Sequence, residues 1–198
     1  MMQDMIKMVN QTDQETAPGF LVASPAAVGS SEFTNTVVAL GVHEQNGALG
    51  FIINRPTDIS LHAVMQDLRL EPRVPDRPVL FGGPVSYNTG FVLYEHPKDC
   101  PAAPGFSLCD TVSVSPSRAL LQEAIAGKLP GHFELLLGYV TWESGQLETE
   151  MKRGGWLSTA FSPGVIFDTP ARNRWSHAVH RLGVSPLAFV RVRGGAQA

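Results

Sequence analysis

The segment Asn54-Arg55 places an amide and a guanidinium between an apolar run, Leu49 to Ile53, and Pro56. Because Pro56 cannot donate a backbone hydrogen bond, we expect a strand to end here with both polar side chains at its exit. A guanidinium binds a carboxylate or phosphate through two parallel hydrogen bonds, so this segment predicts a small-anion site. The structural alternative is that Asn54 satisfies loop backbone and Arg55 pairs with an acid such as Asp58.

The segment Gly82-Gly83 could direct backbone N–H groups at the same kind of anion. It lacks the Gly-Lys-Ser/Thr ending of a P-loop, and Pro84 removes one donor. The alternative, which we favour, is a strained turn between two strands.

Near the C-terminus, Arg174, His177 and Arg181 fall on one side of a predicted helix, beside an apolar stripe that includes Trp175. Residues 151–198 carry seven Lys or Arg and one acidic residue, whereas residues 1–150 carry eight Lys or Arg and 17 acidic residues. A basic helix face can contact nucleic-acid phosphates. The favoured alternative is that the two oppositely charged parts pack together, so nucleic acid is not the preferred partner.

The sequence predicts no metal site, no cofactor and no identifiable catalytic group. His43-Glu44 has no second histidine at metal-binding spacing, and His177 and His180 have no apparent third ligand. A Gly-x-Ser-x-Gly nucleophile motif is missing, and neither Cys100 nor Cys109 has an identifiable base. The protein is therefore expected to act without catalysis, although its enzymatic status stays open.

The composition is that of a globular chain: 43% of the 198 residues are apolar and 17% are charged. No apolar run is long enough to span a membrane, and the N-terminus lacks the apolar core of a secretory signal. We interpret Cys100 and Cys109 as free thiols of a cytoplasmic protein, with a loop-closing disulfide as the alternative. Residues 1–17 are predicted to form a flexible arm and residues 18–198 a single domain.

The order of predicted elements favours an α+β fold with a mixed, largely antiparallel sheet. Asn46-Gly47 predicts a type I′ turn between two strands, and Ser115 is the expected N-cap of a helix. Four helices are expected, beginning near residues 60, 115, 145 and 168. The predicted strands cover residues 20–23, 36–42, 49–53, 79–81, 90–94, 111–114, 133–142, 165–167 and 187–192.

An ordered set of short blocks resembles the YqgE/AlgH family over roughly residues 18–183. The blocks begin with Phe20-Leu21-Val22-Ala23-Ser24-Pro25, Gly47-Ala48-Leu49-Gly50 and Asn54-Arg55-Pro56, and continue with Gly82-Gly83-Pro84-Val85 and Gly90-Phe91-Val92-Leu93. They end with Leu137-Gly138-Tyr139, Trp142, Gly145-Gln146-Leu147-Glu148, Trp156-Leu157, Phe167-Asp168-Thr169-Pro170 and Arg174-Trp175.

This resemblance implies one α+β domain whose branched sheet folds into a pseudo-barrel with helices outside. It implies no established activity and no cofactor, and one branch of the family is described as a transcriptional regulator. Our leading hypothesis is a cytoplasmic, non-enzymatic regulatory or interaction protein. The alternatives are a small-anion binder or enzyme that uses Asn54, Arg55, Gly82 and Gly83, and a nucleic-acid-binding regulator. The sequence does not identify the partner or the oligomeric state.

Overall fold

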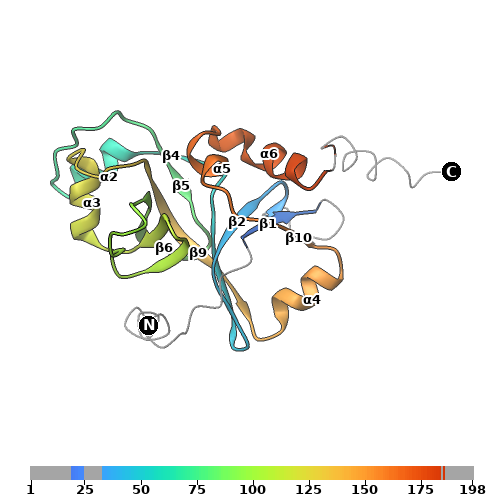
Figure 1. Ribbon diagram of the computed structural model, residues 1–198. Helices are drawn as coiled ribbons and strands as arrows, with labels where there is room; N and C mark the ends of the chain where they lie inside the picture. The colour runs from blue at the N-terminus through green and yellow to red at the C-terminus, as the bar shows by residue number, and fades with distance from the viewer. Residues whose placement is uncertain (1–18, 25–32, 184, 186–198) are drawn as a thin grey trace.

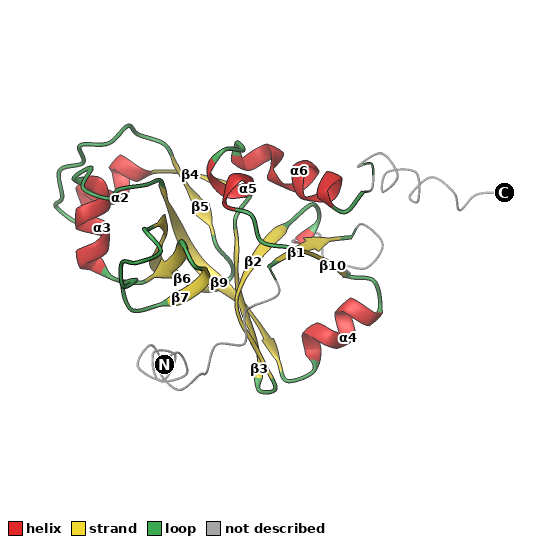
Figure 2. Cartoon of the chain, in the orientation of Figure 1, coloured by secondary structure: helices red, strands yellow, loops and turns green. Residues whose placement is uncertain are grey.

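A computed structural model of the protein describes residues 19–24, 33–183 and 185 (Figures 1 and 2). Its strands are β1 (Phe20–Ala23), β2 (Val37–Glu44), β3 (Gly47–Ile52), β4 (Pro56–Ser60), β5 (Pro78–Phe81), β6 (Val85–Glu95), β7 (Phe106–Cys109), β8 (Val112–Ser115), β9 (Phe133–Glu143) and β10 (Trp156–Thr159). Its helices are α2 (Leu61–Asp67), α3 (Arg118–Ile125), α4 (Gln146–Lys152), α5 (Pro163–Phe167) and α6 (Arg174–Arg181), with the 3-10 turn η2 (Ala171–Asn173) before α6.

The strands form one branched sheet, so the α+β prediction is confirmed. The main path runs β10-β1-β2-β3-β9-β6-β8-β7, and β4 and β5 branch from it at β9. Among the described strands only β5 and β9 pair in parallel, so the sheet is largely antiparallel, as predicted. The path ends at β10 and β7 without joining them, so the sheet is not closed into a barrel.

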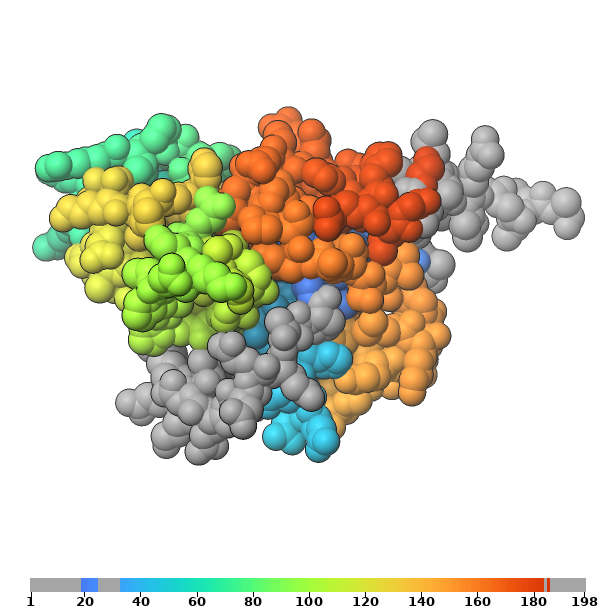
Figure 3. Space-filling model, viewed as in Figure 1, coloured from blue at the N-terminus to red at the C-terminus, as the bar shows by residue number. Residues whose placement is uncertain are grey.

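Each group of helices buries a different apolar cluster against the sheet (Figure 1). Helices α2 and α3 pack on β6 and β9, where Met65 is fully buried. Helices α5 and α6 bury Ile166 and Val179 in the cluster that contains Phe91, and Figure 3 shows them in orange and red beside the green and yellow-green part of the chain. Helix α4 places Leu147 against a third cluster.

The hairpin between β2 and β3 forms as predicted, but its turn differs by one residue. The turn residues are Gln45 and Asn46, and Gly47 already begins β3 opposite Glu44. Gly47 has a φ of +132°, and a Cβ there would lie 2.3 Å from the carbonyl oxygen of Trp142 on β9. The glycine is therefore required both by its positive φ and by the close contact with β9.

Gly82 and Gly83 carry the chain across β9. Strand β5 pairs with Leu137 on one edge of β9, and β6 pairs with the same residue on the other edge. The link between them passes over Gly138: a Cβ on Gly138 would lie 2.2 Å from the Gly83 carbonyl oxygen, and one on Gly82 would lie 2.3 Å from the Gly138 oxygen. Three glycines thus let two backbones cross in contact.

Two local predictions were wrong, and a third cannot be compared. Residues 165–167, expected as a strand, belong to α5, where Pro163 occupies the first turn as prolines favourably do. The N-cap of α3 is Ser117 rather than Ser115, because the Ser117 hydroxyl accepts the N–H of Leu120. Because α5 was not expected, the described residues contain five α-helices, whereas about four were predicted. The strand expected over residues 187–192 lies outside the described residues.

Candidate functional site

An apolar cleft of about 160 Å³ lies where the turn end of the β2–β3 hairpin meets β9 and β7. Its walls come from the β2–β3 hairpin and from two strands distant from it in the sequence, β7 and β9, and one acidic residue, Glu44, is among the lining residues. We call it the hairpin cleft; its lining residues are Val42, Glu44, Asn46, Gly47, Ala48, Leu49, Phe106, Tyr139, Thr141 and Trp142.

The floor of the cleft is a row of aligned residues on three neighbouring strands. Val42 of β2 aligns with Leu49 of β3, and Leu49 aligns with Thr141 of β9, so their side chains share one face of the sheet. Leu49 is buried, Val42 is half-buried and Thr141 is exposed. The row therefore runs from the buried Leu49 to the exposed Thr141, where the cleft reaches solvent.

The wall of the cleft is an aromatic cluster continuous with the core. The Phe106 ring, from β7, lies 5.6 Å from the ring of Phe51, and Phe51 lies 5.2 Å from Phe91. Tyr139 meets Phe91 edge-on at 5.8 Å. Such contacts hold the rings in defined orientations, so the cleft has preformed apolar walls.

Polar contacts fix the strand ends around the cleft. Glu150 of α4 accepts hydrogen bonds from the indole N–H groups of Trp142 and Trp156, at 3.0 and 2.8 Å. His43 contacts Glu148 at 2.6 Å. The pKa of Glu148 is lowered because its own backbone N–H and then the His43 ring stabilise its carboxylate. These contacts tie α4 to the hairpin and to β9.

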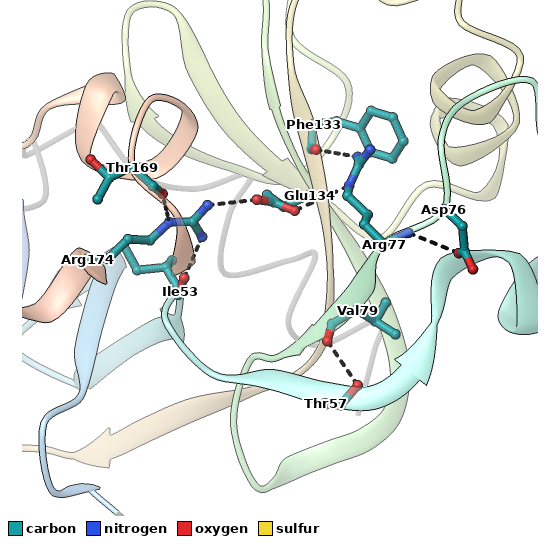
Figure 4. Close-up of polar contacts among 9 residues, drawn as sticks. All are labelled: Ile53, Thr57, Asp76, Arg77, Val79, Phe133, Glu134, Thr169 and Arg174. Carbon is teal, nitrogen blue, oxygen red and sulfur yellow. Dashed lines mark hydrogen bonds and ion pairs between the residues drawn. The ribbon is translucent and has the colours of Figure 1, made fainter. Parts of the chain in front are cut away.

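Figure 4 shows a polar network away from the cleft, centred on Glu134 of β9. Arg174, only 3% exposed, donates to a Glu134 oxygen at 2.7 Å and to the carbonyl oxygens of Thr169 and Ile53. Arg77 lies 3.5 Å from the other Glu134 oxygen. The network joins α6 to β9 and to Ile53, the residue that follows β3, and Arg174 has a structural position in it rather than a surface position.

The other predicted phosphate-contacting residues lie on the outside of α6. His177 and Arg181 are exposed, and the Nδ1 atom of His177 lies 2.8 Å from the Thr169 hydroxyl. His180 and Arg172 are exposed beside them. The structure therefore keeps His177 and Arg181 on one accessible face, but separates Arg174 from them by burial.

The two segments predicted to bind an anion do come together. The Phe81 N–H donates to the Arg55 carbonyl at 2.8 Å, which brings Asn54-Arg55 beside Gly82. Asn54 accepts the Val37 N–H and donates to the Asn35 carbonyl, both at 2.8 Å.

The polar groups of these segments form hydrogen bonds to the backbone of neighbouring segments. The Arg55 guanidinium donates to the Thr34 carbonyl, and the Gly82 N–H donates to that of Leu137. Gly83 lies in the crossing over β9 described above. Anion binding by Asn54, Arg55, Gly82 and Gly83 stays a prediction, and these groups already have structural partners.

Within the described part of the chain, no three His, Cys, Asp or Glu side chains are grouped to hold a metal ion. Cys100 and Cys109 are both free thiols. No helix in the described ranges is both long and apolar enough to cross a membrane. We therefore take the hairpin cleft as the candidate binding site among the described residues. Sequence reasoning missed it because Phe106 belongs to a strand that was not predicted.

A family model described as AlgH-like matches residues 20–187. A UPF0301 protein of Burkholderia multivorans is 40% identical over 185 residues, which cover 92% of each chain. A UPF0301 protein of Anaeromyxobacter dehalogenans is 37% identical over 189 residues, which cover 92% of this chain and 95% of that one.

Two solved structures share the fold. The solution structure of the AlgH protein from Pseudomonas aeruginosa is 33% identical, with a TM-score of 0.71, and the match covers 95% of this chain and 98% of that chain. Protein DIP2367 from Corynebacterium diphtheriae has a TM-score of 0.67 at 19% identity over 92% and 94% of the two chains. At that identity the second structure shows similarity of fold alone.

Proposed function

This chain belongs to the AlgH-like family, and we propose that it is a cytoplasmic regulatory or interaction protein that binds an apolar side chain of a partner protein in the hairpin cleft. The observation that carries this proposal is the preformed apolar cleft beside the exposed residue Thr141. The free thiols of Cys100 and Cys109 support a reducing compartment.

The chemistry of the cleft defines what it would bind. Leu49, Phe106 and Tyr139 supply apolar and aromatic surface, which favours a phenylalanine or leucine side chain. Glu44 lines the cleft, and Glu143 is exposed next to Trp142 at the end of β9. These carboxylates favour a partner segment that carries lysine or arginine near its apolar residue.

The test is a titration of the full-length protein with acetyl-Lys-Gly-Phe-amide, followed by amide chemical shifts in NMR. We expect saturable shifts at Leu49, Phe106 and Thr141. Burying a phenylalanine side chain is worth roughly 1.5–3 kcal/mol, so the matching alanine peptide should bind about tenfold to a hundredfold more weakly. Equal binding of the two peptides, or shifts confined to other regions, would refute the proposal.

A matched pair of variants locates the binding. Thr141→Arg puts a long side chain at the open end of the cleft, and Ser158→Arg makes the same change at an exposed position of β10. Thr141→Arg should abolish binding of the peptide, whereas Ser158→Arg should leave it unchanged. If both variants bind like the unmodified protein, the peptide binds elsewhere.

A second candidate function is nucleic-acid binding, favoured by the exposed face of α6 with His177, His180 and Arg181, next to Arg172. The test is fluorescence anisotropy of a labelled DNA duplex at about 50 and 200 mM salt, because phosphate-driven binding weakens steeply between them. Binding should be lost when Arg172 and Arg181 are both replaced by glutamine. Arg174 is left unchanged because it is buried. Absence of binding at the lower salt would exclude this candidate.

A further inference from the structure

Strand β9 has partners along both edges for only part of its length. On one edge β3 pairs with β9 as far as Glu143, whereas on the other edge β6 pairs only as far as Tyr139, opposite Val85. In the ranges that the structure describes, no strand pairs with this second edge beyond Tyr139. The chain leaves that edge because the link before Val85 crosses over β9.

The backbone of Thr141 points toward this open edge. The Trp142 carbonyl lies against Gly47 of β3, and neighbouring residues of a strand direct their N–H and C=O groups to opposite edges. Tyr139, two residues before Thr141, is aligned with Val85 on the open edge. The Glu143 N–H, two residues after, donates to the Gln146 side chain at 2.9 Å rather than to β3.

The register connects this edge to the hairpin cleft. Thr141 continues the row of Val42 and Leu49, which forms the floor of the cleft. A strand residue placed opposite Thr141 would direct its side chain to the same face, into the cleft. A residue two positions away would face Glu143, which is exposed and belongs to the same face.

We propose that an extended segment of a partner protein adds to this edge as an antiparallel strand, with an apolar residue opposite Thr141 and a lysine or arginine opposite Glu143. The inference rests on the proposed function of the cleft and specifies how the partner binds. Both β3 and β6 run antiparallel to β9, so the added strand continues that pattern. In antiparallel register the basic residue comes two positions before the apolar one, which gives the order basic, any residue, apolar.

The charges around the edge favour this occupant. Glu143 is exposed and Glu44 lines the cleft, while residues 1–150 contain 17 acidic and eight basic residues. Addition of an extended peptide to a sheet edge gains affinity from backbone hydrogen bonds and specificity from pockets for alternate side chains. Thr141 offers the hydrogen bonds, and the cleft offers the pocket.

The test compares two peptides that differ only in one backbone N–H. The first is acetyl-Thr-Lys-Thr-Phe-Gly-Ser-amide, and the second has N-methylphenylalanine in place of phenylalanine. In the proposed register the phenylalanine N–H donates to the Thr141 carbonyl, and methylation removes that bond and blocks the approach of the strand. We expect the methylated peptide to bind the full-length protein at least about tenfold more weakly.

Two controls check the register. Replacing the peptide lysine by aspartate should weaken binding, and the Ser158→Arg variant, changed at an exposed position of β10 away from this edge, should bind the peptide as the unmodified protein does. In hydrogen-exchange NMR the Thr141 amide should become protected when the first peptide is bound.

The outcomes separate this inference from the proposed function. If the two peptides bind equally and both shift Leu49 and Phe106, the cleft binds side chains but strand addition is wrong. If neither peptide binds, while the acetyl-Lys-Gly-Phe-amide titration succeeds, strand addition is also wrong. If neither peptide binds and the protein instead dimerises with protection of Thr141, the occupant is a second copy of this chain, and the proposal of a partner peptide is overturned.

Discussion

Glu134 is predicted to contribute more to stability than any surface carboxylate, because it neutralises a buried arginine (Figure 4). Glu134→Gln keeps the size of the side chain but removes its charge. Arg174 is 3% exposed, and its guanidinium would keep the carbonyl oxygens of Thr169 and Ile53 but lose its only charged contact in the described structure. Removing one partner of a buried ion pair typically costs about 3–5 kcal/mol.

The neighbouring ion pair adds little to this cost. The Arg77 side chain is 32% exposed and its Nε atom lies 3.5 Å from Glu134, so solvent screens the interaction. Arg77 also keeps its bond to the Phe133 carbonyl and its position over the Phe133 ring. We therefore expect Glu134→Gln to lower the free energy of unfolding by about 3 kcal/mol, which corresponds to a fall in Tm of roughly 6–12 °C for a chain of this length.

Thermal and urea unfolding measure this effect, with Glu123→Gln as the matched control on the exposed face of α3. The control should change stability by less than about 0.5 kcal/mol. Adding Arg174→Met to Glu134→Gln should recover part of the loss, since an apolar side chain leaves no unpaired charge. The role of this ion pair would be refuted if Glu134→Gln lowered the Tm by less than about 2 °C, or if adding Arg174→Met recovered none of the lost stability.

Three further predictions concern the rest of the fold. Gly138→Ala should destabilise the protein by at least about 2 kcal/mol more than Gly127→Ala in urea unfolding: both glycines have φ near +70°, but only Gly138 is in contact with another backbone. Ser117→Ala should cost about 1 kcal/mol in the same assay through loss of the α3 N-cap. Burial raises the pKa of Tyr94 in the folded protein, so folding favours the protonated side chain. The stability that this difference contributes is fully present below about pH 10, and it is lost as the pH rises through the higher folded pKa. Thermal unfolding between pH 8 and 11 should therefore show a weaker alkaline loss of stability in Tyr94→Phe.

Local sequence signals predicted the elements that have strong periodicity or long apolar runs. The β2–β3 hairpin and β9 form as expected, and Ser60 caps α2 by accepting the Ala63 N–H. Short apolar runs gave less information: residues 165–167 fit a buried strand or a helix equally well. Pro163 at the first turn was the signal that could have identified α5.

The candidate site was harder to predict, because it depends on contacts between distant segments. Val42, Leu49 and Tyr139 lie on predicted strands, but the cleft also needs Phe106 from β7. The alternation of apolar and polar residues in Phe106-Ser107-Leu108 was a sequence signal for that strand. Arg174 shows the opposite problem: helical periodicity placed it beside His177, but only the tertiary structure shows its burial against Glu134.

The glycines that the sequence suggested as an anion site explain why the proposed docking edge exists. A link from β5 to β6 that stayed on one side of β9 would leave them on the same edge. Gly82 and Gly83 instead cross over Gly138, so β6 starts on the far edge at Val85 and runs away from Thr141. Within the described residues, the crossing thus leaves one edge of the end of β9, the edge opposite β3, without a partner strand beside the apolar cleft. Replacing Gly138 should therefore alter both stability and peptide binding, whereas Thr141→Arg should alter peptide binding alone.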